Sequence, residues 1–515
     1  MKHIRSKLSN IRKHILLFLS VFLLLIATGC APSYGPSERW TQDIAQFRAF
    51  VLETHPKFTD ETLRELERNI ETRAAFNETL DALILDLPYL TDFEITVQLQ
   101  HAAAVLEDNH FDILLSQLAT EEEIAIYPLG FRWLSDGFYL LTTTEAFESA
   151  LNHRLVSIGG QGIDDMFATF LALWSTENIY NARSAFARLL NNPVMLDAIG
   201  LRSGGQVTFG FERADGNMLE ISLSPADLVS MDQLTAISFP VFPVDKRAEG
   251  DLPLFMDIRG SVGNGHNWFY FMEDYGVLYI RLELYMQNID PQTGTFAPFA
   301  KDVKTAFEAH APKAVIIDAR YNPGGDNAYL AELFEFLAEH TESGMLFHFV
   351  DEGSWSASLL GAAHLKSLGA ILLGQPMGQN TDFYGFHSVS VGGSELFFTG
   401  LDFPEDTDLD EYIEIGFATN EYPYFEIVTM TIRAFLELAE GGGSNDADRV
   451  SSDLNLNHSG LLVSVPNLFL SASQMFALDL EFYTLRPHIL IEYTIQDWAN
   501  NHDPVLAHVL ALLAS

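Results

Sequence analysis

The sequence predicts an α/β protein of several domains, and three observations lead to this prediction. The chain has 515 residues, which is longer than one ordinary domain. Hydrophobic residues make up 48% of the chain and aromatic residues 12%, so it can build packed cores. Their spacing is helical near the N-terminus and changes, from about Tyr275 onward, to strands that alternate with helices.

The charge and the cysteine content exclude several classes of protein. The chain carries 70 Asp and Glu residues against 29 Lys and Arg residues, which gives a formal net charge of -41. Nucleic-acid-binding proteins need basic stripes to neutralise phosphates, so we expect no nucleic-acid partner. The single cysteine, Cys30, excludes a disulfide framework and any zinc or iron–sulfur site built from several cysteines.

The first 29 residues have the pattern of a secretory signal. A basic start is followed by the apolar run Ile15–Ile26, which is too short for a good membrane-spanning helix. The small residues before Cys30 resemble a bacterial lipobox, although Ala27 replaces the commoner Leu. This resemblance implies that residues 1–29 are a lipoprotein signal peptide and that Cys30 is diacylated. Residues 30–39 are then a tether to the extracytoplasmic face of the cell membrane. An uncleaved anchor or an unmodified cysteine is the alternative.

Residues 40–125 are predicted to form a helical domain. Apolar residues recur at helical spacing through Leu63–Leu85 and again through Ile95–Leu106. The acidic pair Asp60-Glu61 is predicted to begin the second helix of this domain.

Two further regions follow the helical domain. Residues 126–235 combine short apolar runs with the helical stretch Asp164–Leu190, so we expect a small α+β module. Residues 245–515 are predicted to form a sheet covered by helices. The expected strands are Gly276–Leu282, Ala314–Ile317, Met345–Val350 and Ala370–Leu373, and the expected helices are Phe299–His310, Asp326–His340 and Ser356–Leu368.

Two turns between a strand and a helix carry the residues with the clearest chemistry. The first is Asp318-Ala-Arg320-Tyr-Asn-Pro-Gly-Gly325, whose paired glycines let backbone N–H groups approach a ligand, as an oxyanion hole requires. We expect Asp318 and Arg320 to pair with each other or with the loop. An ordinary strand-to-helix turn is the alternative explanation of this segment.

The second turn is Ser354-Trp-Ser-Ala-Ser358, at the predicted start of a helix. The first N–H groups of a helix have no partner within it, so they can stabilise an oxyanion as well as receive a serine N-cap. The sequence has no Gly-x-Ser-x-Gly motif, which argues against an esterase of the α/β-hydrolase type.

Together with Gly374-Gln-Pro376, these motifs resemble the tail-specific (C-terminal processing) protease family of serine peptidases. That family includes the tricorn core and the interphotoreceptor retinoid-binding protein repeats. The resemblance implies a ClpP/crotonase-like ββα catalytic domain, and it implies that residues 126–235 are a PDZ-like module with a helical insertion. It also implies an insertion in the catalytic domain at residues 386–455.

The resemblance also assigns roles to residues of the two turns. It implies that Ser356 is the nucleophile and that Gly324 or Gly325, together with Ala357, donates N–H groups to the oxyanion. Ser358 is the weaker alternative nucleophile.

Two residues depart from the best-known members of the family. Leu359 stands where those members have Glu, and Gln379 stands near the position of their Lys base. Relatives of the tricorn type use His instead, on a motif that resembles Asp108-Asn-His110. His110 is therefore the expected base, since a neutral imidazole with a pKa of about 6.5 can accept a proton at neutral pH.

Two further positions stay open or are set aside. The third catalytic residue is undecided, since Asp108 is very near His110 in sequence and Glu481 has no motif to support it. Ser471-Ala-Ser-Gln474 mimics the nucleophile motif, but it lies after the Gly374 segment and is interpreted as a decoy.

The sequence thus predicts a lipid-anchored serine endopeptidase that acts on a peptide or protein substrate and needs no metal or organic cofactor. The alternative is a catalytically silent lipoprotein on the same fold that binds peptides or other ligands. The departures at Leu359 and Gln379 motivate this alternative.

Overall fold

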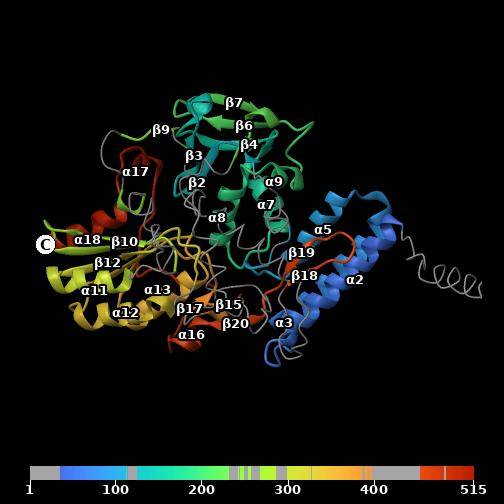
Figure 1. Cartoon of the computed structure of the whole chain (residues 1–515). Coiled ribbons are helices and arrows are strands. Elements are labelled where there is room, and N and C mark those ends of the chain that lie inside the picture. The colour runs from blue at the N-terminus through green and yellow to red at the C-terminus, as the bar shows by residue number, and fades with distance from the viewer. Residues whose placement is uncertain are drawn as a thin grey trace, which may run out of the picture.

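The structure is a computed structural model that describes part of the chain. The described residues are 35–111, 113, 125–230, 242, 244–248, 253–256, 267–285, 299–325, 328–385, 389–391, 394–396, 453–480 and 483–514. The predicted signal peptide, Cys30, Glu481 and most of the predicted insertion at 386–455 lie outside them. Across the described ranges, no helix combines the length and the apolar character that crossing a membrane requires. The prediction of a mixed α/β protein with several domains is confirmed (Figure 1).

The N-terminal part is helical, as predicted. Its first helix begins at Pro36, so the last four residues of the predicted tether belong to it. Asp60 does not begin the second helix: its Oδ1 accepts the N–H groups of Thr62 (2.7 Å) and Leu63 (3.1 Å) as an N-cap would, but only a turn follows, and α4 begins at Glu67. The elements are α2 (Pro36–Thr54), α3 (Pro56–Thr59), α4 (Glu67–Asp86), η1 (Leu87–Tyr89) and α5 (Asp92–Ala104).

A segment from the far end of the chain completes the helical core. The hairpin β18 (Asp453–Asn455) and β19 (Leu462–Ser464) lies beside α2 and α5 (Figure 1). The carboxylate of Asp43 on α2 accepts the N–H groups of His458 (3.0 Å) and Ser459 (2.7 Å). The side chains buried among the helices from this segment are Leu456, Leu461, Val463 and Val465.

The second module is a sheet with helices on one face. Its strand order is β2-β3-β4-β6-β7, with β5 beside β4 and β9 beside β3, and all of these pairs are antiparallel. The helices α7 and α8 lie between this sheet and the helical domain (Figure 1). The strands are β1 (Ala125–Ile126), β2 (Leu129–Leu134), β3 (Gly137–Thr143), β4 (Arg154–Ile158), β5 (Gln161–Gly162), β6 (Val207–Glu212), β7 (Met218–Leu223), β8 (Val229–Ser230) and β9 (Val244–Asp245). The helices are η2 (Glu145–Ala150), α7 (Ile163–Leu173), α8 (Ile179–Leu189), α9 (Pro193–Ala198) and η3 (Pro225–Asp227).

The third module is a six-stranded sheet in the order β10-β11-β12-β13-β14-β21. Only β10 and β11 pair antiparallel, and the other neighbours are parallel. The strands are β10 (Asn267–Met272), β11 (Val277–Leu282), β12 (Ala314–Asp318), β13 (Leu346–Val350), β14 (Ile371–Gly374) and β21 (Ile489–Leu490). The helices are α11 (Phe299–His310), α12 (Ala328–His340), α13 (Ala357–Ser367), α17 (Ile495–Ala499) and α18 (Pro504–Ala514). The shorter elements are η5 (Leu254–Met256), β15 (Asp382–Gly385), β16 (Val389–Val391), β17 (Ser394–Leu396), β20 (Leu468–Ser471) and α16 (Ala472–Met475).

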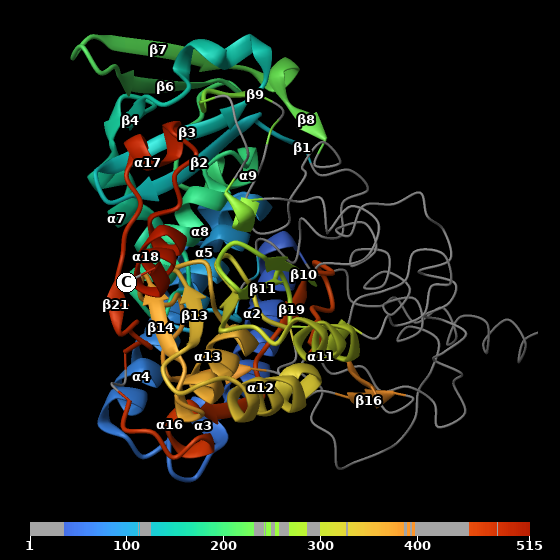
Figure 2. The same cartoon turned by 90° about the vertical axis from the view of Figure 1, so that its left-hand side faces the viewer.

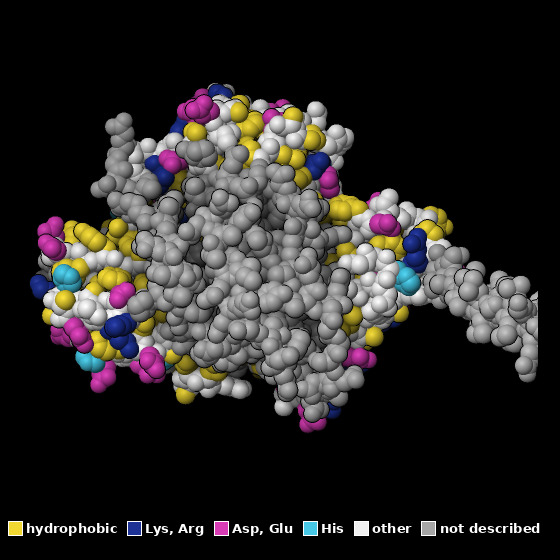
Figure 3. Space-filling view, viewed as in Figure 1, with side chains coloured by type: hydrophobic (Ala, Val, Ile, Leu, Met, Phe, Trp, Pro, Cys, Tyr) yellow, Lys and Arg dark blue, Asp and Glu magenta, His cyan; other side chains and the backbone are white. Residues whose placement is uncertain are grey.

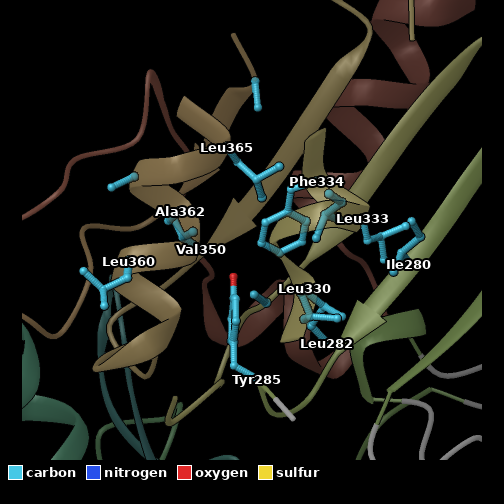
Figure 4. Close-up of a cluster of buried hydrophobic side chains, with 14 of the residues drawn as sticks. Ile280, Leu282, Tyr285, Leu330, Leu333, Phe334, Val350, Leu360, Ala362 and Leu365 are labelled. Carbon is cyan, nitrogen blue, oxygen red and sulfur yellow. The ribbon is translucent and has the colours of Figure 1, made fainter. Parts of the chain in front are cut away.

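The two faces of this sheet bury different cores. On one face, α11, α12 and α13 cover the strands, and α18 packs its Val505 and Val509 against the other face. Figure 4 shows Tyr285 standing in the first core between the helix that carries Leu360 and Ala362 and the side chain of Phe334. This packing requires glycine at position 361, where a Cβ atom would lie 2.2 Å from the Tyr285 hydroxyl oxygen. The absence of a side chain at position 361 thus lets α13 lie directly against Tyr285.

The C-terminal segment joins the second and third modules. Figure 2 shows α17 beside β2 and β3 of the second module. There the Ser135 N–H and hydroxyl both donate to the Tyr493 carbonyl oxygen, each at 2.9 Å. The described surface carries acidic side chains scattered around its rim, with no single acidic patch in the view of Figure 3.

Candidate active site

Ser356 lies at the end of the loop that follows β13, immediately before α13. Its backbone has φ of 58° and ψ of −128°, which is a conformation that side chains rarely adopt. Such a conformation costs on the order of 1–3 kcal/mol and persists only where its surroundings enforce it. Here the Ser356 N–H donates to Oε1 of the buried Gln379 at 2.8 Å. The effect is to turn the Ser356 side chain out of the helix and into the site.

Hydrogen bonds hold the loop that carries Ser356 to the segment that follows β12. The buried Asp351 carboxylate accepts the N–H groups of Tyr321 (2.8 Å) and Gly353 (3.0 Å). The Ser354 hydroxyl donates to the Ala319 carbonyl oxygen at 2.7 Å. The two turns that the sequence singled out are therefore one connected structure.

His110 contacts Ser356 from a different part of the chain. It lies shortly after α5, at the edge of the helical domain, and its Nε2 is 3.0 Å from Ser356 Oγ. The ring packs against Trp355, with centroids 5.0 Å apart, and is stacked on Phe383 at 5.9 Å. Only 10% of the His110 side chain is exposed. The two residues predicted as nucleophile and base are thus within hydrogen-bond distance.

Asp108 supports His110 from the other side of the imidazole. Its Oδ1 accepts the His110 backbone N–H at 2.9 Å and lies 3.8 Å from His110 Nδ1. Its Oδ2 is 2.9 Å from Nε2 of the fully buried His55. Because Nδ1 of His55 accepts the Lys57 N–H at 3.1 Å, neutral His55 carries its proton on Nε2 and donates it to Asp108. The His55 bond therefore fixes the carboxylate that faces His110.

Burial decides the charge of these groups. Desolvation lowers the pKa of His110 and outweighs the negative charge of Asp108, which acts in the opposite direction. Burial raises the pKa of Asp108, but the hydrogen bond and charge of His55 and the charge of His110 more than offset it, so the pKa is lowered. At neutral pH the site therefore holds a neutral imidazole beside a carboxylate, which is the state that a general base requires.

Backbone N–H groups converge beside Ser356. A Cβ atom on Gly324 would lie 2.7 Å from Ser356 Cβ and 3.0 Å from the Ala357 nitrogen, so the glycine turn touches the start of α13. Ala357 is the first residue of that helix, where N–H groups lack partners within the helix. The Gly324 N–H donates to Asn322 Oδ1 at 2.9 Å, which competes with a role in binding an oxyanion. The N–H groups of Gly325 and Ala357 are therefore the better candidates for binding an oxyanion.

Gly325 is held in place by the neighbouring strand end. It has a φ of 121°, and a Cβ atom there would lie 2.3 Å from the Tyr285 carbonyl oxygen. The Tyr285 N–H donates to the Gly324 carbonyl oxygen at 2.7 Å, which anchors the turn. Neither glycine can be replaced without moving the turn, because both the space and the backbone conformation require glycine.

The other predicted residues lie away from this centre. Ser358 is fully buried beside Tyr285, in the core of the third module. Leu359 fills the same core, so the position of the family's Glu is apolar and packed. Ser471 ends β20 and caps the short helix α16, where its Oγ accepts the Gln474 N–H at 3.4 Å.

Glu177, in the loop between α7 and α8, lies at the site although no sequence motif marked it. Its Oε2 accepts the Asn380 N–H at 3.0 Å, and its own N–H donates to Asn109 Oδ1 at 2.8 Å. Burial and the nearby charge of Asp108 raise its pKa well above that of an exposed carboxyl. The sequence gives no signal for this residue, since its place depends on how the second module packs on the first. Among the described residues, Asp108, His110 and Glu177 are also the group whose side chains could hold a metal ion.

The fold is similar to that of solved structures of CPAF. A point mutant of CPAF is similar with a TM-score of 0.56 and 13% identity over 93% of this chain and 97% of that chain. Mature CPAF gives a TM-score of 0.52 at 13% identity, over 93% of this chain and 96% of that one. Mature CPAF complexed with lactacystin gives a TM-score of 0.50 at 13% identity, over 93% of this chain and 98% of that one. No family model and no curated protein sequence matches the chain. At this identity the likeness defines the fold: the chain has the mixed α/β, multi-domain fold of mature CPAF.

Proposed function

We propose that this protein is a serine peptidase of the tail-specific protease type. The observation that carries the proposal is the 3.0 Å contact between His110 Nε2 and Ser356 Oγ, made where Ser356 has a strained backbone beside N–H donors. Nucleophile and base within this distance, with a carboxylate beside the base, are the arrangement that serine acyl transfer needs. The likeness of the fold to CPAF supports the same proposal.

The mechanism proceeds through an acyl-enzyme. Ser356 Oγ forms a bond to the peptide carbonyl carbon while its proton passes to His110 Nε2. The N–H groups of Gly325 and Ala357 bind the oxyanion, and Asp108 stabilises the imidazolium. His110 then gives the proton to the leaving amine as the C–N bond breaks. A water molecule that His110 deprotonates releases the acyl group, so no cofactor is required.

The test is covalent labelling by a fluorophosphonate, which reacts with activated serines. We expect wild type to be labelled and Ser356→Ala to be unlabelled. Ser358→Ala is the matched control, because this serine is two residues away but faces the core. Equal labelling of wild type and Ser356→Ala would overturn the proposal. Absence of labelling in wild type, with peptide binding retained, would favour the catalytically silent alternative.

We also propose that Cys30 carries a lipid anchor that holds the protein on the extracytoplasmic face of the membrane. The support is the signal-like N-terminus, in which an apolar run is followed by small residues and cysteine. Metabolic labelling with a fatty-acid analogue should modify wild type and leave Cys30→Ser unmodified. An unmodified wild-type protein would contradict the anchor without affecting the peptidase proposal.

A further inference from the structure

Tyr321 has a backbone conformation that its residue type rarely adopts. Its φ is 59°, in the left-handed region that favours glycine. For a bulky side chain such a conformation persists only where its surroundings enforce it. Tyr321 lies between the end of β12 and Gly325, whose N–H is the proposed oxyanion donor. The contacts that enforce the conformation of Tyr321 therefore also bear on where that donor lies.

The Tyr321 side chain lies against the loop that carries Ser356. A Cβ atom on Gly353 would lie 2.9 Å from Tyr321 Cδ1 and 3.1 Å from Tyr321 Cα, so the ring packs there only because residue 353 is glycine. The Tyr321 N–H donates to Asp351 Oδ1, which also accepts the Gly353 N–H. Tyr321 thus joins the two turns of the site through its side chain as well as its backbone.

An arginine of the second module packs on the same ring. Leu129 and Phe131 of β2 are buried in the core of their own module, so the alternation of a strand directs Arg132 to the opposite face. The Arg132 guanidinium carbon lies 4.2 Å from the centroid of the Tyr321 ring, which is a cation–π contact, and Arg132 is buried. Phe255 is stacked on the ring, with centroids 6.1 Å apart. Three distant parts of the chain therefore enclose the Tyr321 ring.

The charge of Arg132 has a partner at the same place. Its Nη2 is 3.9 Å from Asp351 Oδ2. Burial raises the pKa of Asp351 to about 6, and the positive charges of Arg132 and Arg320 act against this rise. Arg132 thus favours the ionised carboxylate that accepts the Tyr321 N–H, while its guanidinium packs on the Tyr321 ring.

We propose that Tyr321 is a positioning residue for the oxyanion donor and that the Arg132 guanidinium holds it in place. The ring sets the spacing between the turn that ends in Gly325 and the loop that carries Ser356. Without the ring, nothing at this position enforces the strained backbone, so the turn relaxes and the Gly325 N–H moves away from Ser356. The inference rests on the proposed function, because it takes this N–H as a donor to the oxyanion.

The first test compares variants at position 321 by their rate of fluorophosphonate labelling. Tyr321→Phe keeps the ring and should be labelled at close to the wild-type rate. Tyr321→Asn removes the ring, although asparagine adopts a positive φ more readily than tyrosine does. We expect Tyr321→Asn to be labelled at least about tenfold more slowly, as for partial loss of an oxyanion donor. Labelling of Tyr321→Asn at the wild-type rate would overturn the proposal.

The second test asks whether Arg132 acts through the ring. Arg132→Lys keeps the positive charge but loses the planar guanidinium, so it should slow labelling of the wild-type chain and have no further effect in Tyr321→Asn. Arg154→Lys is the matched control, because Arg154 on β4 pairs with Glu212 within the second module. No slowing by Arg132→Lys, or equal slowing with and without the Tyr321 ring, would overturn the role of Arg132.

A spectroscopic measurement separates positioning from a general loss of stability. In the labelled protein the phosphonyl oxygen bound at Ser356 occupies the oxyanion site, so the ³¹P chemical shift reports on the N–H groups around it. This shift should change in Tyr321→Asn and stay at the wild-type value in Tyr321→Phe. The same shift in all three proteins would overturn the positioning role.

The last measurement does not depend on labelling. If wild type is not labelled, the peptidase proposal fails, but amide hydrogen exchange across residues 321–325 still decides whether the ring holds the turn. Exchange there should be faster in Tyr321→Asn than in wild type and unchanged in Tyr321→Phe. Unchanged exchange in Tyr321→Asn would show that the ring does not hold the turn and would overturn the inference.

Discussion

At the scale of single residues, the proposed mechanism depends on a base that burial keeps neutral. His110 is enclosed by Trp355 and Phe383, and desolvation lowers its pKa below the ordinary value. A lowered pKa extends the pH range in which Nε2 can accept a proton toward acid.

The labelling rate should therefore depend on pH through His110. As pH falls through the lowered pKa of His110, the imidazole becomes protonated, so the rate should fall about tenfold per pH unit, with a midpoint below about 6.5. The second-order rate constant of fluorophosphonate labelling, measured against pH, gives this midpoint. Asp108 raises the pKa of His110, so Asp108→Asn should move the midpoint to lower pH still. A midpoint above 6.5 in wild type would contradict the assignment of His110.

We expect Gln379 to be a positioning residue, although it stands near the position where the family that the sequence resembles has its Lys base. Its Oε1 holds the Ser356 N–H, so Gln379→Leu should leave that donor without a partner at a cost of about 1–3 kcal/mol. We expect labelling of Gln379→Leu to be slower by about tenfold to hundredfold, with the pH midpoint unchanged. Gln379→Glu, which keeps an acceptor oxygen, should lose less. A shift of the midpoint in Gln379→Leu would instead mean that Gln379 takes part in proton transfer.

At the scale of elements, the two turns at the carboxyl ends of β12 and β13 act as one unit. The Trp355 N–H donates to the Asn322 carbonyl oxygen at 3.2 Å, and Gly324 touches Ser356. The parallel sheet brings these turns together because neighbouring parallel strands end at the same edge.

Gly324→Ala should abolish labelling while leaving most of the fold intact. A methyl group there would lie 2.7 Å from Ser356 Cβ, and the φ of 112° disfavours any side chain. We expect the labelling rate to fall by at least about hundredfold, because the clash would move the turn that carries the Gly325 N–H away from Ser356, with the effect of losing an oxyanion donor. Gly344→Ala is the matched control, because its φ is 83° but nothing lies within 4 Å of the added methyl group. Equal labelling of the two variants would contradict a role of the contact between Gly324 and Ser356 in the labelling reaction.

At the scale of the whole molecule, the site is assembled from modules that are far apart in sequence. His110 belongs to the edge of the helical domain, and Ser356 to the third module, 246 residues later. Asn109 links them, since its amide donates to the Gly378 carbonyl oxygen at 2.9 Å while its Oδ1 accepts the Glu177 N–H. The helical domain in turn needs the hairpin β18–β19 to complete its core.

Asp43→Ala should loosen this hairpin. The substitution leaves the N–H groups of His458 and Ser459 without an acceptor, at a cost of about 2 kcal/mol or more. Amide hydrogen exchange across residues 456–461 should become about thirtyfold faster, and proteolysis there should increase. Gln46→Ala is the control, because Gln46 bonds the same segment from an exposed position. Unchanged exchange in Asp43→Ala would show that apolar packing alone holds the hairpin.

The strands and helices that the sequence pattern predicted in the third module are found in the structure to within one or two residues. The helix Phe299–His310 and the strand beginning at Ala314 are where the apolar spacing placed them. The pairing of Asp318 with Arg320 is also confirmed, and the Arg320 guanidinium additionally binds Asp503 at 2.8 Å. The expected helix start at Asp60 was wrong: Asp60 makes the hydrogen bonds of an N-cap, but the chain forms only a turn after it and the helix begins at Glu67.

The sequence by itself determined the residue types of the site and their order. A strand followed by Pro-Gly-Gly or by Ser-Ala-Ser predicts a turn before a helix, because it depends only on residues that are neighbours in the chain. Only the tertiary structure decided which groups meet. It brought His110 to Ser356, put His55 behind Asp108, bonded the Ser356 N–H to Gln379, and placed Glu177 near Asp108 and His110. These contacts join residues tens to hundreds of positions apart. They follow from the packing of three modules. The spacing of residues along the sequence carries no information about that packing.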